Sequence, residues 1–319
     1  MAISAKENLL RAIRHEAADH VPYWSEGSYV LVDCRGRRPP REGLDEWGVA
    51  WAPLPETYVA GAGEPAFSYP VAHPAQSVAE LIERPFPDPR DPACFAGLLK
   101  GIDKASVLAI GRHPAGPFDR LVSLVGMPNA LVATLSDPVA TRAVLDRLAD
   151  YHVEVARGYL AAGAEGGWLA DDYAGQSGPF ISPTVWRRLV LPGLQRILAV
   201  YREAGVPAFF HTCGRAEALL PDLIEAGVTA FNLESAVCDL GALKARFGRR
   251  IAFVGGLSPE VMLRGQPADV RREALRAMST LGGEGGLILA PDQELAYPPE
   301  NEAALVETAR QHGAYPLRI

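Results

Sequence analysis

Cysteine is scarce in this chain, with four residues in 319. Their wide spacing forms no disulfide framework; they are Cys34, Cys94, Cys213 and Cys238. Long apolar runs are also lacking, because none approaches the roughly 20 residues that a membrane-spanning helix needs. Residues 1–16 lack the apolar core of a secretory signal and predict an amphipathic helix, with Ser4 and Glu7 at capping-box spacing. We therefore expect a cytoplasmic protein with no membrane segment.

An excess of positive charge is lacking as well. The chain has 31 Lys and Arg against 38 Asp and Glu, a net charge of −7. Without a long basic stretch, neither nucleic acid nor an anionic membrane surface is an expected partner. Hydrophobic residues make up 48% and charged residues 22%, a balance that is typical of globular proteins and excludes a disordered or collagenous chain.

From residue 106 onward, short apolar runs alternate with amphipathic stretches long enough to form helices. The apolar runs predict strands at 106–111, 167–171, 206–211, 229–233, 250–255 and 286–290. The stretches between them predict helices at 138–162, 183–204, 215–226, 240–247 and 267–281. This alternation indicates parallel strands with helices packed outside. Upstream, 21–26 and 66–71 would supply two further strands and bring the count to eight.

Two architectures fit this alternation, a doubly wound sheet and a (β/α)8 barrel. No GxGxxG or Walker sequence follows any predicted strand, which disfavours the doubly wound sheet. We predict the α/β class, as a single (β/α)8 TIM barrel domain over residues 1–319. The Gly- and Pro-rich segments 33–66 and 84–92 are then irregular elaborations of that domain.

Polar side chains follow several of the predicted strands. In (β/α)8 barrels the chemistry lies at the C-terminal ends of the strands, so these side chains should converge on one mouth. They are Glu26, Asp171, Asp172, His211, Cys213, Glu234, Asp292 and Glu294. Most are acidic, and the nearby cations are Arg112 and Arg215. Such a mouth disfavours a polyanionic substrate. The alternative is that the loop with the arginines of 35–41 folds over the mouth and reverses its local charge.

The pair His211 and Cys213 is the sharpest feature of the sequence. Residues i and i+2 of a strand point to the same side, so an imidazole nitrogen and a thiolate sulfur could hold one Zn²⁺ together. Gly214 would allow the backbone to turn sharply after the pair. The alternative is a buried cysteine beside a hydrogen-bonded histidine.

The carboxylates at the strand ends leave more than one interpretation open. Asp171 and Asp172 could be a metal ligand or an acid/base pair; alternatively, Asp172 caps the next segment and Asp171 binds backbone amides. Glu234 has no obvious helix to cap, which favours a role in the site. Asp239 stands directly before a predicted helix and is expected to cap it.

Several blocks around these residues resemble the uroporphyrinogen decarboxylase superfamily. The stretch 211–235 reads HTCGRAEALLPDLIEAGVTAFNLES, and 171–192 reads DDYAGQSGPFISPTVWRRLVLP. Both are similar to the branch of corrinoid-dependent methyltransferases that transfer methyl groups to thiols. Further similarity lies in 8–22, 45–51, 250–270 and 286–301, so the resemblance spans nearly the whole chain and implies a (β/α)8 barrel.

The methyltransferase branch implies a zinc site made of a His-x-Cys pair and a later cysteine. His211 and Cys213 match the pair, but no cysteine follows Cys238. The later cysteine should fall near Pro291 and Asp292, so we predict Asp292 as the third ligand, ahead of Glu234 and Glu294. The resemblance implies a methylcobalamin-like corrinoid as donor or acceptor, carried on a separate corrinoid protein.

The function predicted from this resemblance is a zinc-dependent methyltransferase. It would move a methyl group between a corrinoid, or a small methyl donor, and a thiol or similar acceptor. Asp171, Asp172 and Glu234 are its candidate catalytic residues. One alternative is a metal-free decarboxylase of a carboxylated substrate, with Asp171 or Asp172 as the acid. Another is a barrel that binds a corrinoid or a small ligand without turnover.

Overall fold

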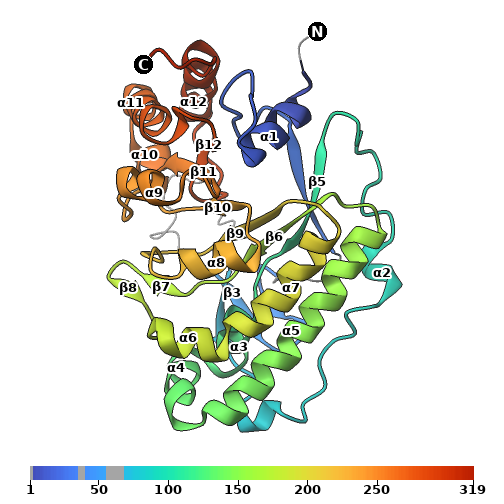
Figure 1. Ribbon diagram of the computed structural model, residues 1–319. Helices are drawn as coiled ribbons and strands as arrows, with labels where there is room; N and C mark the ends of the chain where they lie inside the picture. Colours follow the sequence, from blue (N-terminus) through green and yellow to red (C-terminus); the bar gives the residue numbers. More distant parts are fainter. Residues whose placement is uncertain (1–2, 35–39, 55–67) are drawn as a thin grey trace.

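The computed structural model describes residues 3–34, 40–54 and 68–319. Its main feature is a curled parallel sheet of seven strands in the order β1-β5-β6-β9-β10-β11-β12 (Figure 1). The strands are β1 Tyr29–Asp33, β5 Leu108–His113, β6 Gly166–Ala170, β9 Ala208–His211, β10 Ala230–Asn232, β11 Ala252–Leu257 and β12 Leu287–Pro291. All the neighbouring strands pair in parallel. The predicted TIM-barrel architecture of the α/β class is confirmed.

The eighth strand position holds only a short segment. Trp24 N donates to Leu289 O at 3.0 Å, and Leu289 N donates to Pro22 O at 2.8 Å. Tyr23 thereby forms an isolated parallel bridge with Leu289 of β12. The chain then turns, because Glu26 N bonds to Tyr23 O and the Glu26 carboxylate accepts from Tyr23 N. The predicted strand 21–26 is thus reduced to a bridge, and the eighth strand does not close the barrel.

The prediction of a barrel strand at 66–71 is wrong. Residues 66 and 67 lie outside the described residues, and β4 Ser68–Ala72 belongs to a separate antiparallel sheet with β2 Gly43–Leu44 and β3 Ala50–Pro53. The side chains of β4 are half-buried or exposed, whereas those of β5 are all buried. Pro70 has no N–H to donate, which suits an edge strand and not a central barrel strand.

The outer helices follow the sequence pattern with some shifts. α5 Pro138–Ala161 and α9 Leu240–Phe247 match their predicted ranges, and the Asp239 side chain caps α9 by accepting from Ala242 N. The predicted helix 183–204 divides into α6 Pro183–Leu189 and α7 Leu191–Glu203, because Pro192 cannot continue the hydrogen bonding of α6.

Other helices are shorter than predicted or were not predicted. The range 215–226 contains only α8 Leu220–Ala226, and 267–281 contains α11 Pro267–Ala277 followed by a π turn over Met278–Gly282. Apart from the N-terminal helix, the remaining α-helices of the described residues are α2 Pro92–Phe95, α3 Pro117–Val125, α4 Met127–Ser136, α10 Pro259–Arg264 and α12 Pro299–His312, and Ala79–Leu81 forms a short 3-10 helix.

The N-terminal helix α1 Ala5–Arg14 covers the bottom of the barrel. Ser4 caps it by accepting from Glu7 N, whereas the Glu7 carboxylate pairs with Arg11 and does not complete the predicted capping box. Leu9 and Ile13 pack into the interior cluster, whose other members include Leu108, Phe209 and Ile288. His15 lies against Gly286, just before β12, so α1 is at the N-terminal ends of the strands. The C-terminal ends of the strands, where the predicted site residues lie, are at the opposite end of the barrel from α1.

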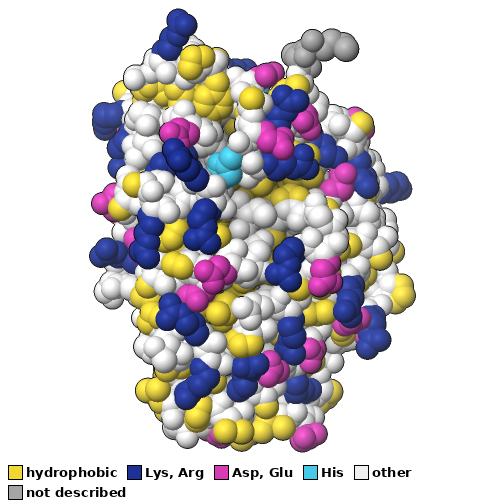
Figure 2. Space-filling view, in the orientation of Figure 1, with side chains coloured by type: hydrophobic (Ala, Val, Ile, Leu, Met, Phe, Trp, Pro, Cys, Tyr) yellow, Lys and Arg dark blue, Asp and Glu magenta, His cyan; other side chains and the backbone are white. Residues whose placement is uncertain are grey.

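Charges of both signs are mixed on the face of the molecule that Figure 2 draws. Hydrophobic side chains are exposed between the charged ones, near the top of this face as well as along its lower edge. Within the described ranges, no helix has the length and apolar character that crossing a membrane requires.

Candidate metal centre

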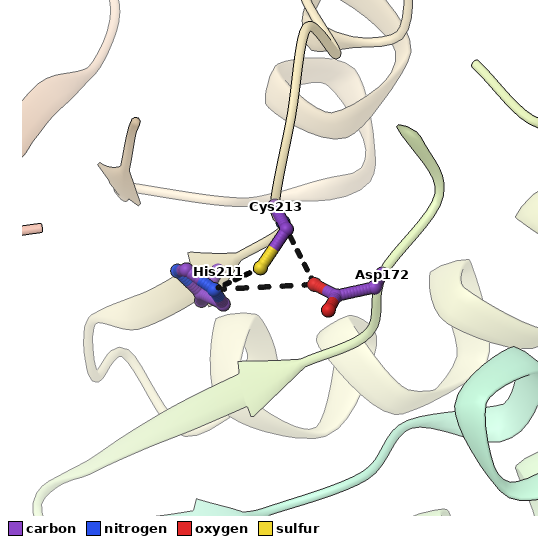
Figure 3. A group of neighbouring side chains, drawn as sticks. All are labelled: Asp172, His211 and Cys213. Carbon is purple, nitrogen blue, oxygen red and sulfur yellow. Dashed lines mark hydrogen bonds and ion pairs between the residues drawn. The ribbon is translucent and has the colours of Figure 1, made fainter. Parts of the chain in front are cut away.

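Three side chains of different chemistry meet at the C-terminal ends of two neighbouring strands. His211 is the last residue of β9, Cys213 follows two residues later, and Asp172 follows β6 by two residues. Ala170 of β6 pairs with His211 of β9, which brings the two strand ends together. One ligand atom from each of Asp172, His211 and Cys213 lies within 4.8 Å of the others (Figure 3).

Distances within this group are short. His211 Nε2 is 3.3 Å from Cys213 Sγ and 3.9 Å from Asp172 Oδ1. Asp172 Oδ1 also accepts from Cys213 N at 2.7 Å. Gly214 makes the turn after Cys213 at φ +74°, and a Cβ there would meet Ala174 O and Gly175 O at 2.5 Å. The turn that sets this loop therefore requires glycine, as the sequence indicated.

Asn232 fixes the orientation of the His211 ring. Its Oδ1 lies 2.7 Å from His211 Nδ1, and its Nδ2 donates to Val254 O at 3.1 Å. Because the amide nitrogen is bound to a carbonyl, the amide oxygen faces the ring and His211 donates from Nδ1. With the proton on Nδ1, Nε2 faces Cys213 and Asp172, where its lone pair could bind a metal. Such an outer hydrogen bond is usual for metal-binding histidines.

In the absence of a cation, the surroundings of Cys213 disfavour ionisation of its thiol to a thiolate. Burial raises the pKa of the thiol far above its usual range, and the carboxylates of Asp172 and Glu234 raise it further. The Gln293 amide opposes this effect weakly, since its Nε2 lies 3.6 Å from Cys213 Sγ. A divalent cation would reverse the balance, because it stabilises thiolate and carboxylates together.

Glu234 and Gln293 form the wall beside this group. Glu234 Oε2 accepts from Gly214 N at 3.0 Å, and Oε1 accepts from Gln293 Nε2 at 3.2 Å. Glu234 therefore lies next to the three-residue group without belonging to it. The sequence argument missed Gln293 and Asn232; the only signal was their position beside residues that it had singled out.

Asp171 holds backbone groups in place. It is fully buried and accepts from Asp119 N at 2.7 Å, Phe118 N at 3.2 Å and the Tyr173 hydroxyl at 2.6 Å. It thus caps the N-terminus of α3 from outside the helix. Burial raises the pKa of Asp171 to about 7, although these hydrogen bonds oppose the rise.

Asp119 links this cap to the metal group. Its Oδ2 accepts from Asp172 N at 3.0 Å. Burial and the neighbouring carboxylates of Asp172 and Asp171 raise its pKa well above the usual range. Asp119 was not among the predicted site residues, because it lies in the first turn of α3, where an acidic residue is ordinary.

Asp292, the predicted third ligand, has other partners. Its Oδ2 accepts from Ser235 N at 2.7 Å and from Ser235 Oγ at 2.5 Å, and its Oδ1 accepts from Gly256 N at 2.8 Å. The side chain is 1% exposed, and burial raises its pKa to about 7. The structure groups Asp172, and not Asp292, with His211 and Cys213.

Glu294 and Glu26 lie in separate ion pairs. Glu294 pairs with Arg112, which also pairs with Asp33. Glu26 lies 2.5 Å from His20. The arginine-rich segment 35–39 falls outside the described residues.

The donor set fits a zinc ion. Imidazole nitrogen, thiolate sulfur and carboxylate oxygen are its three common protein ligands, and three ligands leave a position open for chemistry. The oriented lone pair of His211 Nε2 and the negative surroundings of Cys213 both suit a cation at this point.

Comparison with known proteins identifies the family. The family model described as uroporphyrinogen decarboxylase (URO-D) matches residues 57–312. The chain belongs to the uroporphyrinogen decarboxylase family. Methyltransferases are among its relatives within this family, as the sequence blocks predicted.

Curated relatives include both decarboxylases and a methyltransferase. The uroporphyrinogen decarboxylase of Pseudomonas aeruginosa is 30% identical over 150 residues, which cover 46% of this chain and 40% of that enzyme. The methylcobamide:CoM methyltransferase MtaA of Methanosarcina barkeri is 27% identical over 203 residues, covering 62% of this chain and 57% of that enzyme. The chain therefore matches about half the length of these relatives.

A solved structure supports the fold over its full length. The methyltransferase from Methanosarcina mazei superimposes with a TM-score of 0.72 and covers 97% of this chain and 99% of that one. At 20% identity this similarity establishes the shared fold.

Proposed function

We propose that the protein is a zinc-dependent methyltransferase that moves a methyl group between a corrinoid, or a small methyl donor, and a thiol or similar acceptor. Asp172, His211 and Cys213 would hold the zinc. The observation that carries this proposal is the convergence of three different metal-binding side chains, with the His211 ring oriented by Asn232. We assign the third position to Asp172 in preference to Asp292.

When bound, zinc would supply the positive charge that favours the nucleophilic thiolate form of an incoming thiol. Glu234 is the base for the thiol proton, because it lies beside Cys213 and retains acceptor capacity beyond its bonds to Gly214 and Gln293. In the transfer, the methyl–cobalt bond breaks, a carbon–sulfur bond forms, and cobalt keeps the electron pair. Gln293 keeps Glu234 next to Cys213.

Two further acidic residues hold the backbone around Asp172 in place. Asp119 positions Asp172 through its backbone N–H, and Asp171 holds the first turn of α3 that carries Asp119. A separate corrinoid-carrying protein is the proposed partner, in line with the name of the methylcobamide:CoM relative.

The test measures the demethylation of methylcobalamin by thiols. The reaction is monitored through the change in cobalamin absorbance. Purified protein should show thiol-dependent demethylation that Cys213→Ser abolishes. Cys238→Ser is the matched control, because Cys238 is also a half-buried cysteine but lies outside the metal group. Carbon dioxide release from uroporphyrinogen, without demethylation of methylcobalamin, would instead support the decarboxylase alternative.

A further inference from the structure

The inward-facing residues of β6 are accessible, whereas its outward-facing residues are not. Gly167 faces the outer helices, because a Cβ there would meet the ring of Tyr201 in α7 at 2.2 Å. Side chains alternate along a strand, so Trp168 and Ala170 face the barrel interior. Both are half-buried, while Gly167 and Leu169 are buried. The accessible side of β6 is therefore the interior of the barrel.

The accessible side of Trp168 belongs to the end of the barrel that carries the metal group. β6 is bonded to β5 on one side and to β9 on the other, so the wall is continuous around it. Leu9 and Ile13 of α1 fill the bottom of the interior. Of the two ends of the barrel, the mouth is thus the one from which Trp168 is reached.

The indole of Trp168 lies one inward position below the metal group. Trp168 pairs with Phe209 in the register of β6 and β9, and Ala170 pairs with His211. Two residues along a strand rise by roughly 6.6 Å, which is close to the length of a substituted benzene ring. Ala170 has only a methyl side chain and does not cover the indole, in keeping with the partial exposure of Trp168.

Three rings in this part of the interior are nearly parallel. Phe209 lies 5.5 Å from Trp168 and 6.5 Å from Tyr29 between ring centroids, with interplanar angles of 15° and 25°. Tyr29 faces inward because it pairs in register with Leu108 of the interior cluster, and it is half-buried. A further ring can join such a group by offset stacking, which adds to the effect of buried area alone.

We propose that Trp168, Phe209 and Tyr29 form an aromatic subsite that holds a planar aromatic group of the substrate, with the reacting sulfur or methyl-bearing atom at the metal group. The substrate class is then a small thiol or methyl donor that carries an aromatic ring. This inference rests on the proposed function for the identity of the reaction. Trp168 is the specificity-determining residue, because it belongs to the ring stack and is accessible from the mouth.

The test measures ring binding without zinc, thiol or corrinoid. Metal-free protein is titrated with 4-fluoroanisole, and binding is followed by fluorine NMR. Cyclohexyl methyl ether, a saturated molecule of similar size, is measured by competition against the aromatic probe. The aromatic probe should bind roughly three- to tenfold more tightly, which is the scale of ring stacking beyond area burial.

Variants of Trp168 locate the binding. Trp168→Leu should remove most of the preference for the aromatic probe, whereas Trp168→Phe, which restores a ring, should keep it. Phe95→Leu is the matched control and should also keep it. Phe95 is likewise a half-buried aromatic residue, but it lines an open groove between α2 and α5 on the outside of the barrel.

Equal affinities for the two probes, or no saturable binding to the wild type, would overturn the proposal. So would a preference that persists in Trp168→Leu or is lost in Phe95→Leu. Absence of methylcobalamin demethylation with every thiol would contradict the proposed function alone, since probe binding is measured without metal or methyl transfer.

Discussion

Asp172 and Asp292 each follow an inner strand of the same barrel, yet their surroundings differ. Asp292 is 1% exposed, and both of its oxygens accept hydrogen bonds from Ser235 and Gly256. The Asp172 side chain is 38% exposed, and its Oδ1 lies 3.9 Å from His211 Nε2. The comparison shows that a carboxylate at a strand end has a structural role when hydrogen-bond donors surround it, because it then holds the neighbouring loops in place. A carboxylate that is partly exposed to solvent is available to bind a metal.

The largest expected effect is loss of metal from Cys213→Ser. Removal of the only thiolate in the three-residue group should weaken zinc binding by about a thousandfold, because a hydroxyl is a poor zinc ligand at neutral pH. Competition with a chromophoric chelator measures this affinity. The thermal unfolding midpoint should stay near that of the wild type, and Cys238→Ser should keep its zinc. An unchanged zinc affinity of Cys213→Ser would contradict the assignment of Cys213 as a zinc ligand.

The next effect separates the two aspartates by metal affinity. Asp172→Ala should weaken zinc binding by at least about 10–100-fold, because that is the loss when a metal site loses only an outer hydrogen-bonding partner, and Asp172 is proposed as a ligand itself. Asp292→Ala should leave it within about threefold, because its oxygens face Ser235 and Gly256. The same chelator competition applies to both variants. The opposite order of the two affinities would restore Asp292 as the third ligand.

The same two variants should differ in stability in the opposite order, with Asp292→Ala losing more stability than Asp172→Ala. Asp292→Ala leaves the buried N–H groups of Ser235 and Gly256 without their acceptor, at a cost of about 2–3 kcal/mol in the free energy of unfolding. Asp172→Ala should cost less than about 1 kcal/mol, since its side chain is partly in water. Urea unfolding of the metal-free proteins measures both values. Equal losses would contradict the distinction between an enclosed and an open carboxylate.

The smallest effect is a pH dependence that Asp292 adds to stability. Burial raises its folded pKa to about 7, above the value of about 3.9 in an unfolded chain. Between these values the folded state holds a proton that the unfolded state has lost. The contribution is therefore complete below about pH 4 and decreases as the pH rises toward 7, by about 1.4 kcal/mol per pH unit at most.

Urea unfolding between pH 4.5 and 7 should show this slope as the difference between the wild type and Asp292→Ala. Comparison with a single variant removes the contributions of other groups, such as Asp171. A difference that stays constant over this range, or that grows with pH, would show that Asp292 is ionised in the folded protein.

Much of the fold was predictable because burial leaves a regular trace in the sequence. The apolar runs at 167–171 and 229–233 lie within two residues of β6 and β10, since parallel strands buried on both faces must be continuously apolar. The segment 66–71 was wrongly counted as a barrel strand. Over a few residues, an exposed antiparallel strand can have the same apolar content as a buried barrel strand.

The candidate site was predictable only in part. His211 and Cys213 were identified from their spacing, which depends on one strand and its immediate continuation. The choice between Asp172 and Asp292 depends on donors from other segments, Ser235 and Gly256, which no local pattern reveals. The role of Asn232 likewise requires knowing that β10 lies beside β9 with Asn232 opposite His211.

The most direct test of the account is anomalous diffraction at the zinc edge from crystals of protein grown with one equivalent of zinc. The account predicts one strong anomalous peak per chain. The zinc ion at this peak should lie at the usual ligand distances of about 2.0–2.3 Å from Asp172, His211 and Cys213. Asp292 should remain on Ser235 and Gly256. A peak ligated by Asp292 or Cys238, or the absence of zinc from His211 and Cys213, would contradict the account.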